Sequence, residues 1–270
     1  MNSPRIGVFD SGFGGLTVLS ALLRHIPHAC YTFLGDTARL PYGSKSRRTV
    51  AHYASEAAQF LVEQQGAEYL VIACNTASAL ALDAIQDAVP VPVLGVIEPG
   101  ANAARAASKT GDVLVIATQA TVQSHAYASA CRDKGLRALE KACPLLVPLV
   151  EEGWTDHPVT AQVIDIYLNE LRREAREEGL NYDTLVLGCT HYPLLRPLLE
   201  KAVTAGVRVI DSAEATAEAA MRLFGQSGAG NPQTAQVRCF ATDSVDKFER
   251  LGSRFLGRPV GKVELVDLGG

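Results

Sequence analysis

The sequence VIACNTAS, residues 71–78, changes from strand-like to helix-like character within one short stretch. The apolar run from Tyr69 to Ala73 stops at Cys74, small polar residues follow, and an alanine-rich helical pattern comes next. This order predicts a buried strand, a tight turn and a helix N-terminus. In open parallel sheets, ligands bind at the carboxyl ends of the strands, where Cys74 would lie. The N–H groups at a helix start also favour a thiolate there.

The same succession recurs about 115 residues further along the chain, from Cys74 to Cys189. The apolar run TLVLG, residues 184–188, stops at Cys189, and Thr190 and His191 follow. A cysteine at one strand end is most often only a small buried side chain, and for either cysteine alone we favour that explanation. Because both cysteines stand at the same point of the same pattern, the sequence predicts two similar half-sites that face one another.

The composition is that of an ordinary globular protein, with 47% hydrophobic and 20% charged residues among 270. A net charge of −4 argues against nucleic acid as the main partner. No apolar run is long enough for a membrane span, and the start MNSPR is no signal peptide. We therefore expect a cytoplasmic protein whose six cysteines are reduced. Without a C-x-x-C pair, no structural zinc site is expected.

Strand and helix patterns alternate along the chain, which indicates α/β units on parallel sheets. Eight such units could close into a TIM barrel. We prefer two open parallel-sheet domains, because the cysteine turns recur nearly half a chain apart and two lobes would place both at one cleft. Within this pattern we expect a strand at Leu145–Val150 that ends before Glu151, and a surface loop rich in Gly, Ser, Asn and Pro at 225–233.

Polar side chains gather where the expected strands end. A free thiol has a pKa of about 8.5, close enough to neutrality for it to act as a base in one direction and an acid in the other. Two thiols on opposite faces of one carbon could therefore invert a stereocentre. The polar residues at these ends are Asp10, Ser11, Cys74, Asn75, Thr76, Thr118, Thr121, Glu151, Cys189, Thr190 and His191.

Three other interpretations of these residues remain open at this point. Cys189, His191 and Glu151 could form a nucleophilic set, as in cysteine-dependent amidases, although this leaves Cys74 unused. Cys74, Cys189 and His191 could instead hold a metal ion with one open position. A two-lobed amino-acid binding module without catalysis is the third alternative, and it has no need for reactive thiols.

Five stretches together resemble the glutamate racemases of the aspartate/glutamate racemase family, cofactor-independent enzymes that supply D-glutamate to bacterial cell-wall synthesis. They are spread over most of the chain in the expected order, and the two cysteine motifs are the most specific of them. The matching stretches are DSGFGG at 10–15, PYG at 41–43, ACNTAS at 73–78, VPLVEEG at 147–153 and GCTHYP at 188–193.

The resemblance assigns roles to individual residues. It implies that Cys74 and Cys189 are the catalytic acid/bases, with Cys74 facing the D-isomer and Cys189 the L-isomer. By the same resemblance Asp10 assists Cys74, and His191 assists Cys189. Glu151 is similar to a third assisting carboxylate, although Glu152 beside it leaves that assignment open. The positions that match substrate-holding residues are Asp10, Ser11, Tyr42, Gly43, Asn75, Thr76, Thr121, Thr190 and His191.

The resemblance also implies an architecture and a set of partners. It implies two pseudo-symmetric α/β domains with the active site between them, the first at 1–97 plus 208–270 and the second, inserted, at 98–207. Catalysis is expected without cofactor or metal, with glutamate as the substrate and no membrane or nucleic-acid partner. Family members are often dimers, so a homodimer is one expected assembly. Some members carry an N-terminal extension linked to activation by a cell-wall nucleotide precursor, which we do not expect here.

Overall fold

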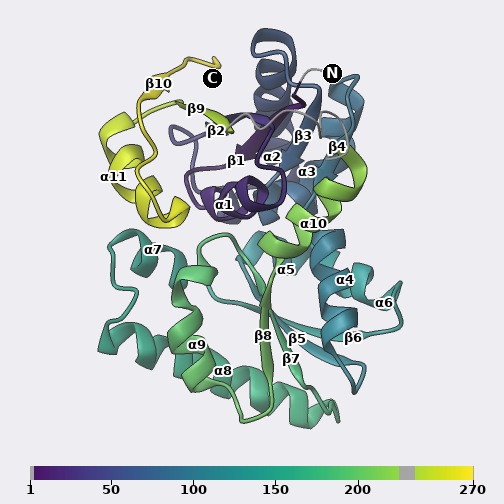
Figure 1. Cartoon of the computed structure of the whole chain (residues 1–270). Helices are drawn as coiled ribbons and strands as arrows, with labels where there is room; N and C mark the ends of the chain where they lie inside the picture. Colours follow the sequence, from purple (N-terminus) through teal and green to yellow (C-terminus); the bar gives the residue numbers. More distant parts are fainter. Residues whose placement is uncertain (1–2, 225–234, 270) are drawn as a thin grey trace.

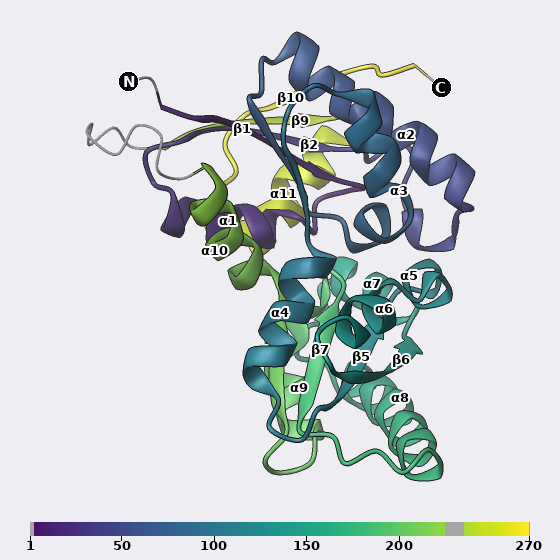
Figure 2. The ribbon, with the colours of Figure 1, turned by 90° about the vertical axis from the view of Figure 1, so that its right-hand side faces the viewer.

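The computed structural model describes residues 3–224 and 235–269, so the loop expected at 225–233 lies outside the described residues. These residues form two parallel β-sheets with helices around them, which confirms the predicted α/β class (Figure 1). The sheets lie in separate lobes, with α4 and α10 at their junction (Figure 2). Two separate open sheets also rule out the TIM-barrel alternative.

The first sheet has the strand order β10-β9-β2-β1-β3-β4, and every pairing in it is parallel. Its strands are β1 (Arg5–Asp10), β2 (Cys30–Gly35), β3 (Tyr69–Ile72), β4 (Val93–Gly95), β9 (Gln236–Ala241) and β10 (Val263–Leu265). The helical segments of this lobe are α1 (Leu16–His25), a 3₁₀ turn (Tyr42–Ser44), α2 (Arg47–Gln59), a π-helical stretch (Phe60–Gln64), α3 (Asn75–Ala88) and α11 (Val245–Leu256).

The second sheet has the order β6-β5-β7-β8 and is also parallel throughout. Its strands are β5 (Asp112–Ala117), β6 (Arg137–Ala142), β7 (Thr184–Gly188) and β8 (Arg208–Asp211). The remaining helices are α4 (Ile97–Ala107), α5 (Gln119–Ser124), α6 (Ala126–Arg132), α7 (Leu146–Glu151), α8 (Pro158–Glu177), a 3₁₀ turn (Tyr192–Leu195), α9 (Arg196–Ala202) and α10 (Ser212–Phe224).

The two sheets repeat one topology. The order β2-β1-β3-β4 in the first sheet corresponds to β6-β5-β7-β8 in the second. Cys74 follows β3 and Cys189 follows β7, so the two cysteines stand after corresponding strands. Both strands are central and almost wholly buried, which explains their apolar sequences. The repeated sequence pattern is therefore a repeated structure.

The turn at Cys74 has the conformation that the sequence predicts. Cys74 is extended (φ −64°, ψ 118°) and caps α3, and its sulfur accepts a hydrogen bond from the backbone N–H of Ala77. The sulfur thus takes the place of the side-chain oxygen that usually satisfies a free N–H group at a helix start. This capping fixes the thiol at the carboxyl edge of the first sheet.

Two predictions about secondary structure and sheet membership are wrong. The run Leu145–Val150 is not a strand: Leu145 precedes helix α7 and the rest belongs to that helix, in which Leu146 and Val150 are buried one helical turn apart. The strand of this region is β6, whose sequence RALEKA is polar because β6 is an edge strand and only partly buried. Residues 208–211 pair with β7 in the second sheet, whereas the domain boundary at 207/208 assigned them to the first domain. The domain division otherwise stays a prediction.

Within the described ranges, 3–224 and 235–269, no helix is both long and apolar enough to cross a membrane.

Candidate active site

A cavity of about 170 Å³ lies at the carboxyl ends of the strands, and residues of both lobes line it. One water molecule needs only about 10–15 Å³ of such space, so the cavity has room for a small organic molecule. Two of the predicted site residues, Asp10 and Thr121, are buried behind its wall. The predicted site residues that line the cavity are Ser11, Tyr42, Gly43, Cys74, Asn75, Thr76, Glu151, Cys189, Thr190 and His191.

The Cys74 half-site holds a protonated sulfur. Its Sγ lies 3.4 Å from the hydroxyl of Ser11 and 3.4 Å from the backbone nitrogen of Ala77. Burial, followed by the nearby Asp10 carboxyl group, raises the pKa of Cys74 to about 12, although Ser11 and Ala77 act in the opposite direction. The N–H group of Ala77 at the helix start thus favours the thiolate, as the sequence indicates, but burial outweighs it and leaves the pKa of Cys74 raised.

Asp10 brings an unsatisfied oxygen to the same half-site. It ends β1 and is only 1% exposed, and its Oδ2 accepts a hydrogen bond of 3.0 Å from Gly12 N. Its Oδ1 has no partner among the described residues. Burial raises the pKa of Asp10, an effect that the charge of His191 partly offsets. A buried acceptor without a partner costs about 1–3 kcal/mol, and protonation of the carboxyl group would relieve that cost.

The Cys189 half-site is built around a charged histidine. Cys189 Sγ lies 3.9 Å from Nδ1 of His191, whose Nε2 lies 3.2 Å from Oε1 of Glu151. Burial would lower the pKa of His191, but hydrogen bonds to Cys189 and Glu151 outweigh it and raise the value to about 10. Burial acts to raise the pKa of Glu151, but the contact with His191 has the opposite effect. Nζ of Lys247, 3.4 Å from Oε2 of Glu151, also lowers this pKa, so the net shift is downward. The imidazolium can stabilise negative charge on the adjacent sulfur.

The two half-sites touch through a glycine of the β1–α1 turn. A Cβ at Gly14 would lie 2.4 Å from Oγ1 of Thr190 and 2.7 Å from Nδ1 of His191. The hydroxyl of Thr17 also donates to the carbonyl oxygen of Thr190, at 3.4 Å. Only a residue without a side chain lets the first lobe approach the Cys189 turn this closely. The glycine-rich motif therefore serves packing between the lobes at the site.

A set of neutral hydrogen-bonding side chains also belongs to the site. The hydroxyls of Thr76, Thr118 and Thr121 contact each other pairwise at 2.9–3.3 Å. Asn75 Oδ1 accepts a hydrogen bond of 2.7 Å from the hydroxyl of Tyr127, while its Nδ2 has no partner among the described residues. Because Asn75 also lines the cavity, it offers a free donor to an anionic group.

Thr118 and Tyr127 are missing from the residues that the resemblance suggested. Thr118 lines the cavity, whereas Thr121 lies behind it and reaches the site only through the other two hydroxyls. The sequence signal for Thr118 was its position directly after β5, where it caps α5. Tyr127 lies in α6 rather than at a strand end, so no sequence pattern pointed to it.

The structure distinguishes Glu151 from Glu152. Glu151 lines the cavity and contacts His191, whereas Glu152 lines a separate apolar groove beside Trp154.

The alternatives to a two-thiol site fit the structure less well. The contacts of Cys189, His191 and Glu151 have the order that a nucleophilic set needs, but they leave Cys74 and Asp10 without a role. Among residues 3–224 and 235–269, no cluster of three or more His, Cys, Asp or Glu side chains is placed to hold a metal ion.

Replacing Glu151 by Gln removes the charge that supports the His191 imidazolium. We expect kcat to fall on the order of 10- to 100-fold and the pKa of His191 to fall below its value of about 10. Activity that needs charged His191 is lost as pH rises through that pKa, so the basic limb of the pH–rate profile moves to lower pH. Glu152→Gln is the matched control and keeps the original profile. An unshifted limb in the Glu151 variant would contradict this account.

Comparison with known proteins agrees with the site. The model of the Asp/Glu/Hydantoin racemase family matches residues 16–220. The chain therefore belongs to the Asp/Glu/Hydantoin racemase family. The glutamate racemase of Koribacter versatilis is 58% identical over 292 aligned residues, which cover 99% of this chain and 98% of that protein. The glutamate racemase of Syntrophus aciditrophicus is 46% identical, with 99% of both chains covered.

Solved structures show the same relationship. The glutamate racemase isoform RacE1 of Bacillus anthracis superposes with a TM-score of 0.90 at 39% identity, with 99% of both chains covered. The glutamate racemase of Francisella tularensis, solved in complex with D-glutamate, gives 0.88 at 34% identity, with 99% of this chain and 98% of that chain covered. Within its family, the chain thus groups with the glutamate racemases.

Proposed function

We propose that this racemase interconverts L- and D-glutamate by two proton transfers, with Cys74 and Cys189 on opposite sides of the α-carbon. The observation that carries the proposal is that corresponding strands of the two sheets each end in a cysteine, and both cysteines line one cavity. Full-length similarity to glutamate racemases supports glutamate as the substrate, as does the complex of the Francisella protein with D-glutamate.

The groups that surround the two thiols fit one direction of the reaction. From L-glutamate, Cys189 removes the α-proton as a thiolate, with the negative charge stabilised by His191. Cys74, which burial keeps protonated, then donates its proton to the opposite face and yields D-glutamate. One proton leaves and one arrives, so the substrate keeps its charge. In the reverse direction Cys74 must first lose its proton, and Asp10, whose carboxyl group acts on the pKa of Cys74, is the group that we expect to assist.

Both ends of the substrate need partners in the cavity. We propose that Ser11 and the backbone N–H groups of Tyr42 and Gly43 hold one carboxylate. The other carboxylate is held by the opposite wall, where Asn75 has its unpaired donor. The hydroxyls that complete this wall are those of Thr76, Thr118 and Thr190, with Thr121 supporting the first two from behind.

The physiological role that we propose is the supply of D-glutamate for peptidoglycan synthesis. The enzyme would act in the cytoplasm, without cofactor, as a homodimer. A bacterial strain that requires added D-glutamate tests the role directly, because expression of the chain should remove that requirement. Size-exclusion chromatography with light scattering tests the dimer.

Incubation of the pure protein with L-glutamate, followed by chiral chromatography, tests the activity. We expect the mixture to approach equal amounts of both isomers. The aligned contacts of Cys189, His191 and Glu151 favour an amidase as the second candidate. Release of ammonia from L-glutamine without any D-glutamate would replace our proposal with that alternative.

A further inference from the structure

The segment between β2 and α2 forms a continuous wall of the cavity. Residues 40–44 all line it, and they include Tyr42 and Gly43. Apart from one 3₁₀ turn at Tyr42–Ser44, this segment contains no helix or strand. Contacts of its side chains must therefore fix its position.

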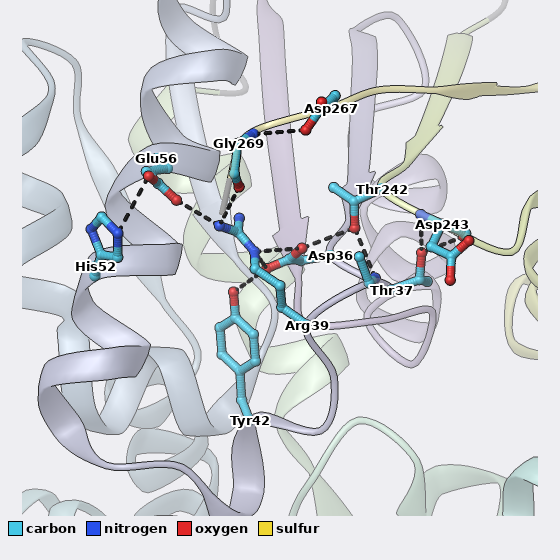
Figure 3. A network of polar contacts seen from close by, with 11 residues as sticks. Asp36, Thr37, Arg39, Tyr42, His52, Glu56, Thr242, Asp243, Asp267 and Gly269 are labelled. Carbon is cyan, nitrogen blue, oxygen red and sulfur yellow. Dashed lines mark hydrogen bonds and ion pairs between the residues drawn. The ribbon is translucent and has the colours of Figure 1, made fainter.

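Asp36 provides those contacts from outside the cavity (Figure 3). Its side chain is fully buried, and it does not line the cavity. Its carboxylate accepts hydrogen bonds from Nε of Arg39 at 2.8 and 3.0 Å, from the hydroxyl of Tyr42 at 2.5 Å and from the hydroxyl of Thr242 at 2.9 Å. Burial, followed by the adjacent Asp36, raises the pKa of Tyr42, so its hydroxyl keeps the proton that it donates.

The contacts of Asp36 connect segments that are far apart in the sequence. Arg39 also contacts Glu56 of α2 at 2.5 Å, and its guanidinium group lies 4.3 Å from the ring centre of Tyr53. Thr242 directly follows β9, about 200 residues along the chain from Asp36. Figure 3 shows the side chains of Arg39, Tyr42 and Thr242 converging on the Asp36 carboxylate, with Glu56 on the far side of Arg39. A buried carboxylate with charged and neutral donors on both oxygens makes a strong and directional anchor.

We propose that Asp36 is a positioning residue for the substrate: it holds the wall at residues 40–44 in place, and through it one substrate carboxylate. This inference rests on the proposed racemisation of glutamate. No contact of Asp36 reaches the reacting carbon, so its effect passes through Tyr42. A wall that is no longer anchored binds glutamate more weakly, and it also tolerates a shorter dicarboxylate that an anchored wall would misplace.

Two substitutions test the anchor and one controls for stability. Asp36→Asn keeps the size but loses the charge and one acceptor, and Thr242→Val removes a single hydrogen bond from outside the segment. Asp112→Asn removes another buried aspartate that is paired with an arginine, the exposed Arg137, at the start of β5 and away from the cavity. The measurements are KM and kcat for L-glutamate and L-aspartate, the melting temperature, and amide hydrogen exchange of peptides that span residues 37–46.

For Asp36→Asn we expect KM for glutamate to rise about tenfold or more, and the preference for glutamate over aspartate in kcat/KM to fall by a similar factor. Exchange of the 37–46 amides should become faster. For Thr242→Val we expect the same changes at roughly two- to fivefold. Asp112→Asn should lower the melting temperature while leaving KM, the substrate preference and the exchange of this segment unchanged.

Variants that are folded at the assay temperature but show wild-type KM, substrate preference and exchange overturn the proposal. If Asp36→Asn does not fold, Thr242→Val decides by the same criteria. Asp36 variants that change only in melting temperature, as the Asp112 variant does, also overturn it, because they show a purely structural role. A wild-type protein that does not interconvert the glutamate isomers would instead refute the proposed function.

Discussion

Cys74→Ser and Cys189→Ser should each lose about 10³-fold or more of the racemisation rate in both directions, while the protein stays folded. A serine hydroxyl is a far weaker acid than a thiol, so one of the two proton transfers fails in each variant. The cavity and its hydrogen bonds need little change, because oxygen replaces sulfur in a side chain of the same shape, and at Cys74 serine is also a favoured capping residue. Chiral chromatography gives the rates, and the melting temperature reports the fold.

The same variants should separate the two half-reactions. In heavy water, the Cys74 variant should still exchange the α-proton of L-glutamate through Cys189, without forming D-glutamate. The Cys189 variant should exchange D-glutamate alone. Cys30→Ser, at a partly exposed cysteine in β2 that does not line the cavity, is the control and should keep the wild-type rate. Near-normal racemisation by the Cys74 variant would refute the two-cysteine mechanism.

The second large effect that we expect is discrimination against aspartate. Aspartate is one methylene shorter, and in an apolar pocket such a difference changes kcat/KM only about 10–200-fold. In the binding mode that we propose both carboxylates are held, so aspartate could not reach both sets of donors without moving its α-carbon away from the thiols. A displacement of about 1 Å can cost on the order of 10²-fold in rate.

Because both effects act together, kcat/KM for L-aspartate should be lower than for L-glutamate by about 10³-fold or more, with losses in kcat as well as KM. Steady-state kinetics with both amino acids measures the ratio. L-Glutamine, which has the same length but a neutral end, serves as a control for the distal charge. A comparable kcat/KM for aspartate would show that the anchors lie elsewhere and that the enzyme is a broader amino-acid racemase.

The cysteine turns could be predicted from the sequence because each combines a buried parallel strand with an abrupt change to small polar residues. Both faces of such a strand are covered, so its apolar run is continuous and easy to recognise. The run at Leu145–Val150 lacked this clarity, since a short apolar stretch fits a buried helix face equally well. The polar edge strand β6 gave no apolar signal at all.

The protonation state of Cys74 and the contacts between distant segments could not be predicted from the sequence, for a different reason. The pKa of Cys74 depends mainly on how completely the folded chain shields the thiol from water. The position of a cysteine at a helix start does not reveal that burial. The supports of the site from Tyr127 and Thr242 come from distant segments brought together only by folding. Asp36 stands between a glycine and a threonine directly after β2, and no nearby sequence pattern marks it as an anchor.

The central claim is that two different groups remove and return the proton. The most direct measurement starts from L-glutamate in heavy water, stops the reaction early and determines deuterium at the α-carbon of each isomer by mass spectrometry after chiral separation. With opposed thiols, the D-glutamate formed should carry solvent deuterium, while the remaining L-glutamate keeps its protium. Deuterium appearing in the remaining L-glutamate as fast as D-glutamate forms would show a single base serving both faces, and would contradict the assignment of Cys74 and Cys189.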